Sequence, residues 1–198
     1  MTGRIFRPFS IGGFTITPED EPLTPMGGIP LVMGKKGAFG SGEHETTRSC
    51  LELLEQLPQV RGARVLDFGS GTGILAIAAV KLGASSVVAL DIDPRAAVSC
   101  SRNIGLNNVH GLVNAVCGEL ACLRGGSYDL VLANIYADVL GNVAEELVAM
   151  TRPGGLVLLS GIPVQDDSGV HGLFLRYGCR TLRTIFLDEY LTFLLEKD

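Results

Sequence analysis

Three glycines alternate with other residues in segment 67–73, whose sequence is DFGSGTG. Because glycine lacks a Cβ atom, this spacing lets the backbone turn sharply and approach a ligand closely. The stretch that follows is predicted to be a helix, and free N–H groups at a helix start favour a carboxylate or phosphate. We therefore predict that Gly69, Gly71 and Gly73 bind the carboxylate of a cofactor. Asp67 is predicted either to face the amino group of that cofactor or to accept a hydrogen bond from the loop.

This loop is consistent with two cofactors. S-adenosylmethionine carries a carboxylate on its methionine part, and an acidic residue before three alternating glycines is the methyltransferase form of the loop. Residues 71–76 (GTGILA) also match the dinucleotide fingerprint GxGxxA, with Asp91 near the distance that the fingerprint expects. Because Ala76 is also explained as a helix-packing residue, we predict S-adenosylmethionine as the cofactor. A nicotinamide-dependent oxidoreductase is the alternative.

Acidic residues follow the next two apolar runs of the sequence. Asp91 ends the second run, where a carboxylate can accept charge-assisted hydrogen bonds from both ribose hydroxyls. Asp93 precedes Pro94, a residue favoured in the first turn of a helix, so Asp93 is predicted to cap that helix. Glu119 follows the third run and is predicted to border the adenine, with a plain surface turn as the alternative.

The fourth apolar run ends in segment 133–138, ANIYAD. Asn134 is predicted to lie beside the methyl sulfonium, where its carbonyl can accept a hydrogen bond from the cofactor or a substrate amine. Tyr136 is predicted to line the acceptor pocket, because an aromatic face tolerates a cationic amine. These two residues are the predicted catalytic residues, which orient the acceptor nitrogen. A structural alternative is that Asn134 caps the helix starting at Ala137.

The elements that position these residues follow from the alternation of short apolar runs and helical stretches. Continuous apolar runs are typical of parallel strands that are covered on both faces. The predicted strands are 64–68, 86–91, 112–116, 129–133 and 156–160. The predicted helices are 43–57, 73–82, 94–105 and 137–151, the second ending at Gly83. This order predicts an α/β fold with a doubly wound Rossmann-like sheet, in which ligands bind beyond the carboxyl ends of the strands.

Both ends of the chain depart from this alternation. Segments 180–187 and 190–195 are separated by two residues only, which predicts a C-terminal antiparallel hairpin on the mostly parallel sheet. Residues 1–42 are predicted to be an N-terminal arm or linker with a lid loop, in which 11–17 form one short strand. Residues 43–198 are predicted to be the methyltransferase domain. Segment 37–47 places glycines before a helix start and looks like a lid, although on composition alone an ordinary loop is the better interpretation.

Composition narrows the class of partner. The chain has 198 residues, 46% of them hydrophobic and 19% charged, which fits one domain with a short extension. Its net charge of −5 comes without clustered Lys and Arg, so direct nucleic-acid binding is not expected. Five cysteines without a CxxC pair indicate reduced thiols and no metal site. No apolar run is long enough to cross a bilayer. We therefore expect a cytoplasmic protein with no membrane partner.

Several segments taken together resemble the ribosomal protein L11 methyltransferase (PrmA) family. The matching segments are 38–47 (AFGSGEHETT), 65–82, 91–94 (DIDP), 133–135 (ANI), 153–155 (PGG) and 160–162 (SGI). The glycine loop is common to many methyltransferases, whereas segment 39–47 joined to 133–135 is much more specific to this family. The resemblance implies a class I S-adenosylmethionine-dependent methyltransferase with cofactor contacts at Thr47, Gly69, Asp91 and Asn134. It also favours the lid interpretation, which adds Phe39 and Thr46 to the predicted cofactor-binding residues.

The resemblance further implies that the methyl acceptor is an amine of a protein, either a lysine side chain or an N-terminal amine. Family members begin with a small domain that holds the ribosomal protein, and this sequence starts at about the linker that follows it. The protein partner is therefore predicted to be a ribosomal protein or another lysine-bearing protein, as for the similar lysine methyltransferases of electron transfer flavoprotein β. The family's near-terminal tryptophan is replaced around Tyr190, which alters the expected acceptor pocket. A small-molecule methyltransferase and a non-catalytic cofactor-binding module remain as alternatives.

Overall fold

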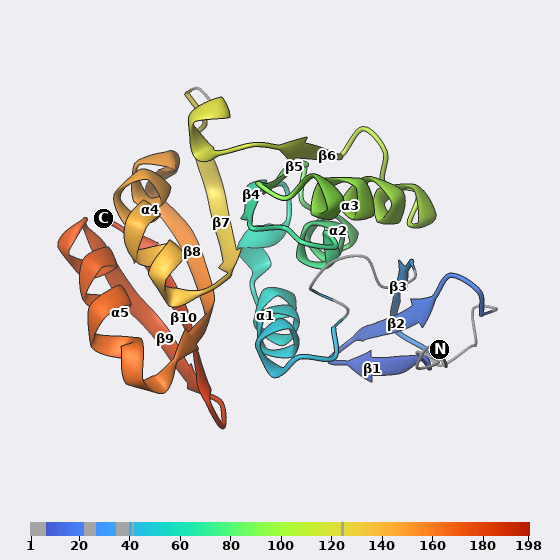
Figure 1. The fold of residues 1–198 in the computed structure, drawn as a ribbon, viewed down its shortest axis with the longest axis horizontal. Coiled ribbons are helices and arrows are strands. Elements are labelled where there is room, and N and C mark those ends of the chain that lie inside the picture. The colour runs from blue at the N-terminus through green and yellow to red at the C-terminus, as the bar shows by residue number, and fades with distance from the viewer. Residues whose placement is uncertain (1–6, 22–26, 35–39, 41, 124) are drawn as a thin grey trace.

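The computed structural model describes residues 7–21, 27–34, 40, 42–123 and 125–198 of the chain. It shows a large central sheet with helices on both faces and a small N-terminal sheet at one side (Figure 1). In these residues no helix combines the length and the apolar character needed to cross a membrane.

The central sheet has seven strands in the order β6-β5-β4-β7-β8-β10-β9. Their bounds are β4 (Arg64–Phe68), β5 (Ser86–Asp91), β6 (Val113–Cys117), β7 (Tyr128–Asn134), β8 (Thr151–Pro163), β9 (Cys179–Phe186) and β10 (Tyr190–Lys197). Neighbouring strands from β6 to β8 are parallel, and β10 is antiparallel to both β8 and β9. The predicted α/β fold, with a mostly parallel sheet and a C-terminal hairpin, is confirmed.

The strand order of the sheet reverses between β4 and β7. From β4 the chain proceeds outward to β5 and β6, then returns to β7 and proceeds to β8 on the other side. In an open parallel sheet, such a switch point leaves a crevice beyond the carboxyl ends of the strands, and ligands bind there. The loops that follow β4, β5 and β7 therefore border the expected site.

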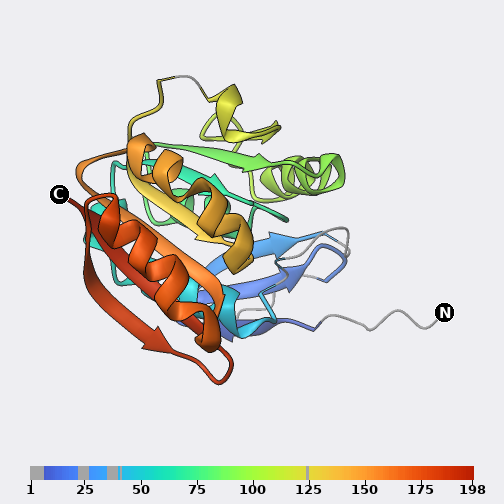
Figure 2. The ribbon, with the colours of Figure 1, turned by 60° about the vertical axis from the view of Figure 1, so that its left-hand side comes forward.

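Helices cover both faces of the central sheet (Figure 2). One face carries α1 (Glu45–Glu55), α2 (Ile74–Lys81) and α3 (Pro94–Leu106), and the other carries α4 (Ala137–Met150) and α5 (Asp167–Arg176). Short 3-10 turns occupy Pro58–Val60, Leu120–Cys122 and Val164–Asp166. The first four helices lie within a few residues of their predicted bounds. Helix α5 was not predicted, because its Gly169 and Gly172 weaken the helical signal in the sequence.

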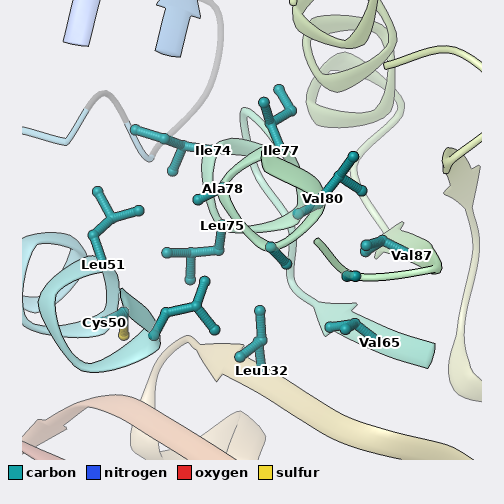
Figure 3. Close-up of a cluster of buried hydrophobic side chains, with 14 of the residues drawn as sticks. Cys50, Leu51, Val65, Ile74, Leu75, Ile77, Ala78, Val80, Val87 and Leu132 are labelled. Carbon is teal, nitrogen blue, oxygen red and sulfur yellow. The ribbon is translucent and has the colours of Figure 1, made fainter. Parts of the chain in front are cut away.

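Helix α2 is the most deeply buried helix segment beside the expected site. Its residues 74–80 are all buried, since α1, α3, the central sheet and the N-terminal sheet surround them. Figure 3 shows Leu75 and Ala78 of α2 beside Leu51 of α1, with Val65 and Leu132 contributed by the sheet. A helix that is apolar on all sides is stable only when it is covered on all sides. The glycine loop that leads into α2 is therefore attached to a rigid element.

The N-terminal residues form a three-stranded sheet of their own. Its strands are β1 (Phe9–Ile11), β2 (Phe14–Pro18) and β3 (Ile29–Met33), with β1 antiparallel and β3 parallel to β2. The predicted strand over residues 11–17 is confirmed only over residues 14–17, which lie in β2, because the chain reverses at Gly12, which has φ of +51°. Buried apolar side chains from this sheet join the core formed by α1, α2 and α3.

Two predicted helix ends are confirmed in detail. Gly83, with φ of +105°, ends α2, and the N–H groups of Gly83 and Ala84 donate to the carbonyls of Val80 and Ala79. Asp93 caps α3, since its Oδ1 accepts from the N–H of Arg95 at 2.9 Å. The Arg95 side chain also donates to this carboxylate and lowers the pKa of Asp93.

Lys197 holds the C-terminal end of α4. Its Nζ donates to the carbonyl oxygens of Val148 at 2.8 Å and Thr151 at 2.7 Å, and its positive charge lies at the negative end of the helix dipole. We expect Lys197→Met to lower the free energy of unfolding by about 2 kcal/mol, measured by urea denaturation. Lys81→Met is the control, because Lys81 ends α2 without such contacts in the described residues. Equal losses in the two variants would contradict this role.

Candidate active site

The sequence-predicted site residues gather at the carboxyl edge of the central sheet. Those that the structure describes come from the start of α1, the ends of β4, β5 and β7, the loop between β4 and α2, the turn after β6 and the start of α4. They are Thr46, Thr47, Asp67, Gly69, Gly71, Gly73, Asp91, Glu119, Asn134 and Tyr136. Phe39 lies outside the described residues.

The three glycines of the loop have positive φ angles of +71° at Gly69, +53° at Gly71 and +78° at Gly73. A side chain is strained in this region of backbone conformation. Space is also short, because a Cβ at Gly69 would lie 2.1 Å from Cγ2 of Ile135, and one at Gly73 would lie 2.4 Å from Sγ of Cys100. The sharp turn expected from the sequence is present, and the side chains of Ile135 and Cys100 pack closely against its backbone.

Asp67 is buried at the end of β4, with 1% of its surface exposed. Its Oδ2 accepts a hydrogen bond from the N–H of Ala76 at 3.1 Å, so it fixes the first turn of α2. Burial raises the pKa of Asp67 to about 7; the Ala76 hydrogen bond lowers it, and the negative charge of Asp91 raises it further. Ala76 is itself fully buried within α2, as its helix-packing interpretation predicts.

Asp91 connects the loops that follow β4 and β5. Its Oδ2 accepts from the N–H of Gly71 at 2.8 Å, and its Oδ1 accepts from the N–H of Asp93 at 2.9 Å. Each carboxylate oxygen accepts more than one hydrogen bond, so both can also accept from a ligand. Asp91 therefore shapes the glycine loop and presents acceptors beside it.

Asn134 ends β7 and binds the start of α1. Its Nδ2 donates to Oγ1 of the buried Thr47 at 3.3 Å. The alternative role as a helix cap is wrong, because Tyr136 holds the cap position of α4 and makes no side-chain cap bond. Gly161, near the end of β8, lets Asn134 and Ile135 pack closely against its backbone. A Cβ at Gly161 would lie 2.6 Å from the carbonyl oxygen of Ile135 and 3.3 Å from Oδ1 of Asn134.

The loop geometry fits a cofactor that carries a carboxylate. The Ser70 hydroxyl is buried in the loop beside the thiol of Cys100, so it is packed against the protein. The cap residue of α2 is Gly73, which offers no side-chain oxygen to the N–H groups at the helix start. Those N–H groups and the positive end of the helix dipole favour an anion.

The side chains of the other predicted residues form no hydrogen bond with the glycine loop, which the structure describes in full. Glu119 and Tyr136 are exposed at the rim, and neither side chain forms a hydrogen bond within the described residues. The Thr46 hydroxyl is within hydrogen-bond distance of Nδ1 of His44, at 2.8 Å. The His44 ring meets the Tyr190 ring edge-on, with 5.3 Å between ring centroids. The hairpin tip therefore lies against the start of α1.

Two contacts that hold the glycine loop in place were not predicted from the sequence. The Thr72 hydroxyl donates to the carbonyl oxygen of Gly40 at 2.6 Å, and the Asn103 amide donates to the carbonyl oxygen of Thr72 at 2.8 Å. The one available signal was an Asn in the interior of a predicted helix, where this residue type is unfavourable. No local pattern shows which backbone group it binds.

Comparisons with known proteins agree with this geometry. Residues 2–178 match the family model described as ribosomal protein L11 methyltransferase (PrmA). The ribosomal protein L11 methyltransferase of Geobacter sulfurreducens is 45% identical over 175 residues, which are 87% of this chain and 57% of that protein. The crystal structure of ribosomal protein L11 methylase from Lactobacillus delbrueckii subsp. bulgaricus has a TM-score of 0.85 and 26% identity, covering 98% of this chain and 100% of that chain.

A further solved structure shows the cofactor class of this fold. It is a 16S rRNA methyltransferase from T. thermophilus in complex with AdoMet and guanosine, with a TM-score of 0.68 and 26% identity, covering 82% of this chain and 46% of that chain. The chain spans little more than half the length of the curated relatives it matches, 57% in the Geobacter sulfurreducens protein. Within that span, the chain belongs to the ribosomal protein L11 methyltransferase (PrmA) family of S-adenosylmethionine-dependent methyltransferases.

Proposed function

We propose that the chain transfers a methyl group from S-adenosylmethionine to the side-chain amine of a lysine in a protein substrate. The observation that carries the proposal is the hydrogen bond between Asn134 and Thr47, at the same edge of the sheet as the glycine loop and Asp91. The proposed cofactor-binding residues are Phe39, Thr46, Thr47, Asp67, Gly69, Gly71, Gly73, Asp91, Glu119 and Asn134.

Asn134 is the residue proposed to orient the acceptor nitrogen. Because its Nδ2 donates to Thr47, the amide is turned so that Oδ1 is the atom that can accept an N–H from a substrate amine. The cofactor supplies a methyl group on a cationic sulfur, which is a good leaving group, so the protein contributes mainly alignment and exclusion of water. Tyr136, with 77% of its surface exposed, offers an aromatic face to an incoming cationic side chain.

The charge of the carboxyl edge supports a cationic substrate. Exposed carboxylates occur there on Glu119, Asp138 and the hairpin turn 188–189, while the nearby Arg95 is paired with Asp93 at 3.0 Å. Carboxylates of this kind attract a lysine-bearing segment. The amine must then lose a proton, and a partly dry pocket beside a cationic sulfonium lowers its pKa from the usual value of about 10.4.

Ribosomal protein L11 is the first candidate acceptor, because the relatives of this chain carry its name. In this proposal, residues 43–198 form the methyltransferase domain, and residues 1–42 form the arm and lid. All five cysteines are free thiols, which supports action in the reducing cytoplasm. Direct contact with nucleic acid or membrane has no part in the proposal.

Calorimetric titration with S-adenosylhomocysteine, with NAD as the parallel titrant, tests the cofactor. Binding of S-adenosylhomocysteine alone supports the proposal, and binding of NAD alone overturns it. Incubation with radiolabelled S-adenosylmethionine and ribosomal protein L11, followed by acid hydrolysis, then tests the acceptor. Label recovered as methylated lysine supports N-methylation of a protein. Label recovered only in a small molecule from a cell extract would show that the acceptor is not a protein amine.

We expect Asn134→Ala to lower the rate of methyl transfer about 100-fold, because the acceptor nitrogen loses its alignment. The Kd for S-adenosylhomocysteine is expected to change much less, since the glycine loop and Asp91 are intact. The control is Asn114→Ala, which removes an exposed amide from β6 far from the switch point and should leave both values unchanged. If Asn134→Ala transfers methyl groups at the same rate as the unsubstituted protein, Asn134 does not orient the acceptor nitrogen.

A further inference from the structure

Asn103 lies in the interior of α3, and only 1% of its surface is exposed. Asn is unfavourable within a helix because its side chain competes for backbone hydrogen bonds. A buried amide also costs free energy unless its donor and acceptor groups are both paired. The contacts of this side chain must therefore compensate for two unfavourable features.

Each end of the Asn103 amide binds a backbone group from a different segment. Oδ1 accepts from the N–H of Gly34 at 2.8 Å, and Nδ2 donates to the carbonyl oxygen of Thr72 at 2.8 Å. Gly34 directly follows β3, and Thr72 lies within the glycine loop. The fit at Gly34 is close, because a Cβ there would lie 3.1 Å from Oδ1 of Asn103. One side chain therefore links the N-terminal sheet to the glycine loop.

Thr72 is also held from its other side. Its Oγ1 donates to the carbonyl oxygen of Gly40 at 2.6 Å, and only 6% of the Thr72 surface is exposed. The contact is tight, since a Cβ at Gly40 would lie 2.9 Å from this hydroxyl. Gly34 and Gly40 thus both connect to Thr72, the first through Asn103 and the second directly. Thr72 in turn lies between Gly71 and Gly73, two of the proposed cofactor-binding residues.

We propose that Asn103 is a positioning residue for the cofactor, which sets the curvature of the glycine loop by fixing the Thr72 carbonyl against the N-terminal sheet. Asn103 acts through Thr72 and does not touch the cofactor itself. The inference rests on the proposed cofactor site, and it makes the N-terminal sheet a part of the unit that binds S-adenosylmethionine. Loss of the Asn103 amide frees the loop to adopt other curvatures, and binding must then order it again.

Asn107, one turn after Asn103 and directly after the last residue of α3, offers a matched comparison. It is also buried, at 3% exposure, and its amide pairs with both backbone groups of Val32 in β3, at 2.9 Å to the N–H and 2.7 Å to the carbonyl oxygen. Its third hydrogen bond goes to the carbonyl oxygen of Asn103 within the helix. Asn107 therefore holds the same strand to the same helix, yet it makes no bond to the glycine loop.

The test compares Asn103→Ala and Asn107→Ala in the full chain, with thermal unfolding and calorimetric titration of S-adenosylhomocysteine. Both variants are expected to lower Tm, because both lose buried hydrogen bonds to the N-terminal sheet. Only Asn103→Ala is expected to weaken binding, by about tenfold, since only it releases the loop. Equal affinities in the two variants, or equal losses, would overturn the positioning role. A parent chain that does not bind S-adenosylhomocysteine overturns the proposed function and this inference together.

Thr72→Val provides a second test that does not remove the Asn103 amide. Valine has nearly the shape of threonine and keeps the backbone carbonyl, but it cannot donate to Gly40. If the fixed position of Thr72 sets the loop, this variant is expected to bind S-adenosylhomocysteine several-fold more weakly with a small change in Tm. Weaker binding in Asn103→Ala with unchanged affinity in Thr72→Val would assign the loop position to the Asn103 bond alone. Unchanged affinity in both variants would contradict the inference.

Discussion

Asp91→Ala is expected to weaken the binding of S-adenosylhomocysteine at least about 100-fold. The structure shows that the carboxylate accepts from the N–H groups of Gly71 at 2.8 Å and Asp93 at 2.9 Å, so it holds the glycine loop in place. In the proposed complex the same oxygens accept the ribose hydroxyls. Hydrogen bonds to a charged group contribute about 1.5–3 kcal/mol each, so losing the loop contact and the ribose contact together accounts for the expected effect.

Two further variants separate these contributions. Asp91→Asn keeps one carbonyl oxygen as an acceptor and is expected to lose less affinity than the alanine variant. Asp93→Ala removes the cap of α3 and the exposed ion pair with Arg95 but leaves the Asp91 carboxylate in place, so it should lower stability by about 1 kcal/mol with little effect on binding. Calorimetric titration of the three variants gives the affinities, and urea unfolding gives the stabilities. Asp91→Ala binding at the parent affinity would exclude Asp91 from the cofactor site.

Local sequence signals were sufficient for the elements that carry the glycine loop. Strands 64–68 and 86–91 were predicted with their observed bounds. Each is a continuous apolar run, and a polar residue, an acidic residue or a glycine lies at each end of the run. Gly83 marks the C-terminal end of α2 and Asp93 marks the start of α3, and both signals come from residues next to the helix concerned. The carboxyl edge followed from topology, since parallel strands present their ends on one side.

The contacts that complete the site depend on residues far apart in the sequence. Thr47 and Asn134 are 87 positions apart, and nothing near either residue identifies the other. The N-terminal sheet was missed for a similar reason, because β3 pairs with β2 across a connection rich in proline and glycine. Asn103 was missed because its partners are backbone groups, which every residue has. These contacts require the three-dimensional arrangement of α1, α3 and the central sheet.

Cofactor affinity is expected to rise with pH up to about pH 7, while the stability of the free protein falls over the same range. Burial raises the pKa of Asp67 from 3.8 to about 7, the hydrogen bond from Ala76 lowers it, and the charge of Asp91 raises it. The neighbouring thiols of Cys50 and Cys100 have pKa values raised by burial to about 12, so they remain neutral throughout this range. The group that gains or loses a proton in this range is therefore Asp67.

The effect on stability follows from which state binds the proton. Between pH 3.8 and about pH 7 the folded protein keeps a proton on Asp67 that the unfolded chain has lost. The free energy of unfolding therefore falls as pH rises, by at most about 1.4 kcal/mol for each pH unit. Asp67→Asn keeps an acceptor for Ala76 but cannot titrate, so urea unfolding of this variant should lack that slope.

Binding has the opposite dependence, because the amino group of the cofactor is a cation and favours ionised Asp67. Below about pH 7 a proton must leave on binding, so the Kd for S-adenosylhomocysteine should rise by up to about tenfold for each pH unit. Calorimetry in buffers of different ionisation enthalpy measures the released proton directly. Asp67→Asn should bind with a flat profile and, above pH 7, more weakly than the parent. A flat profile in the parent would mean that Asp67 does not sense the cofactor and serves only as the acceptor that fixes α2.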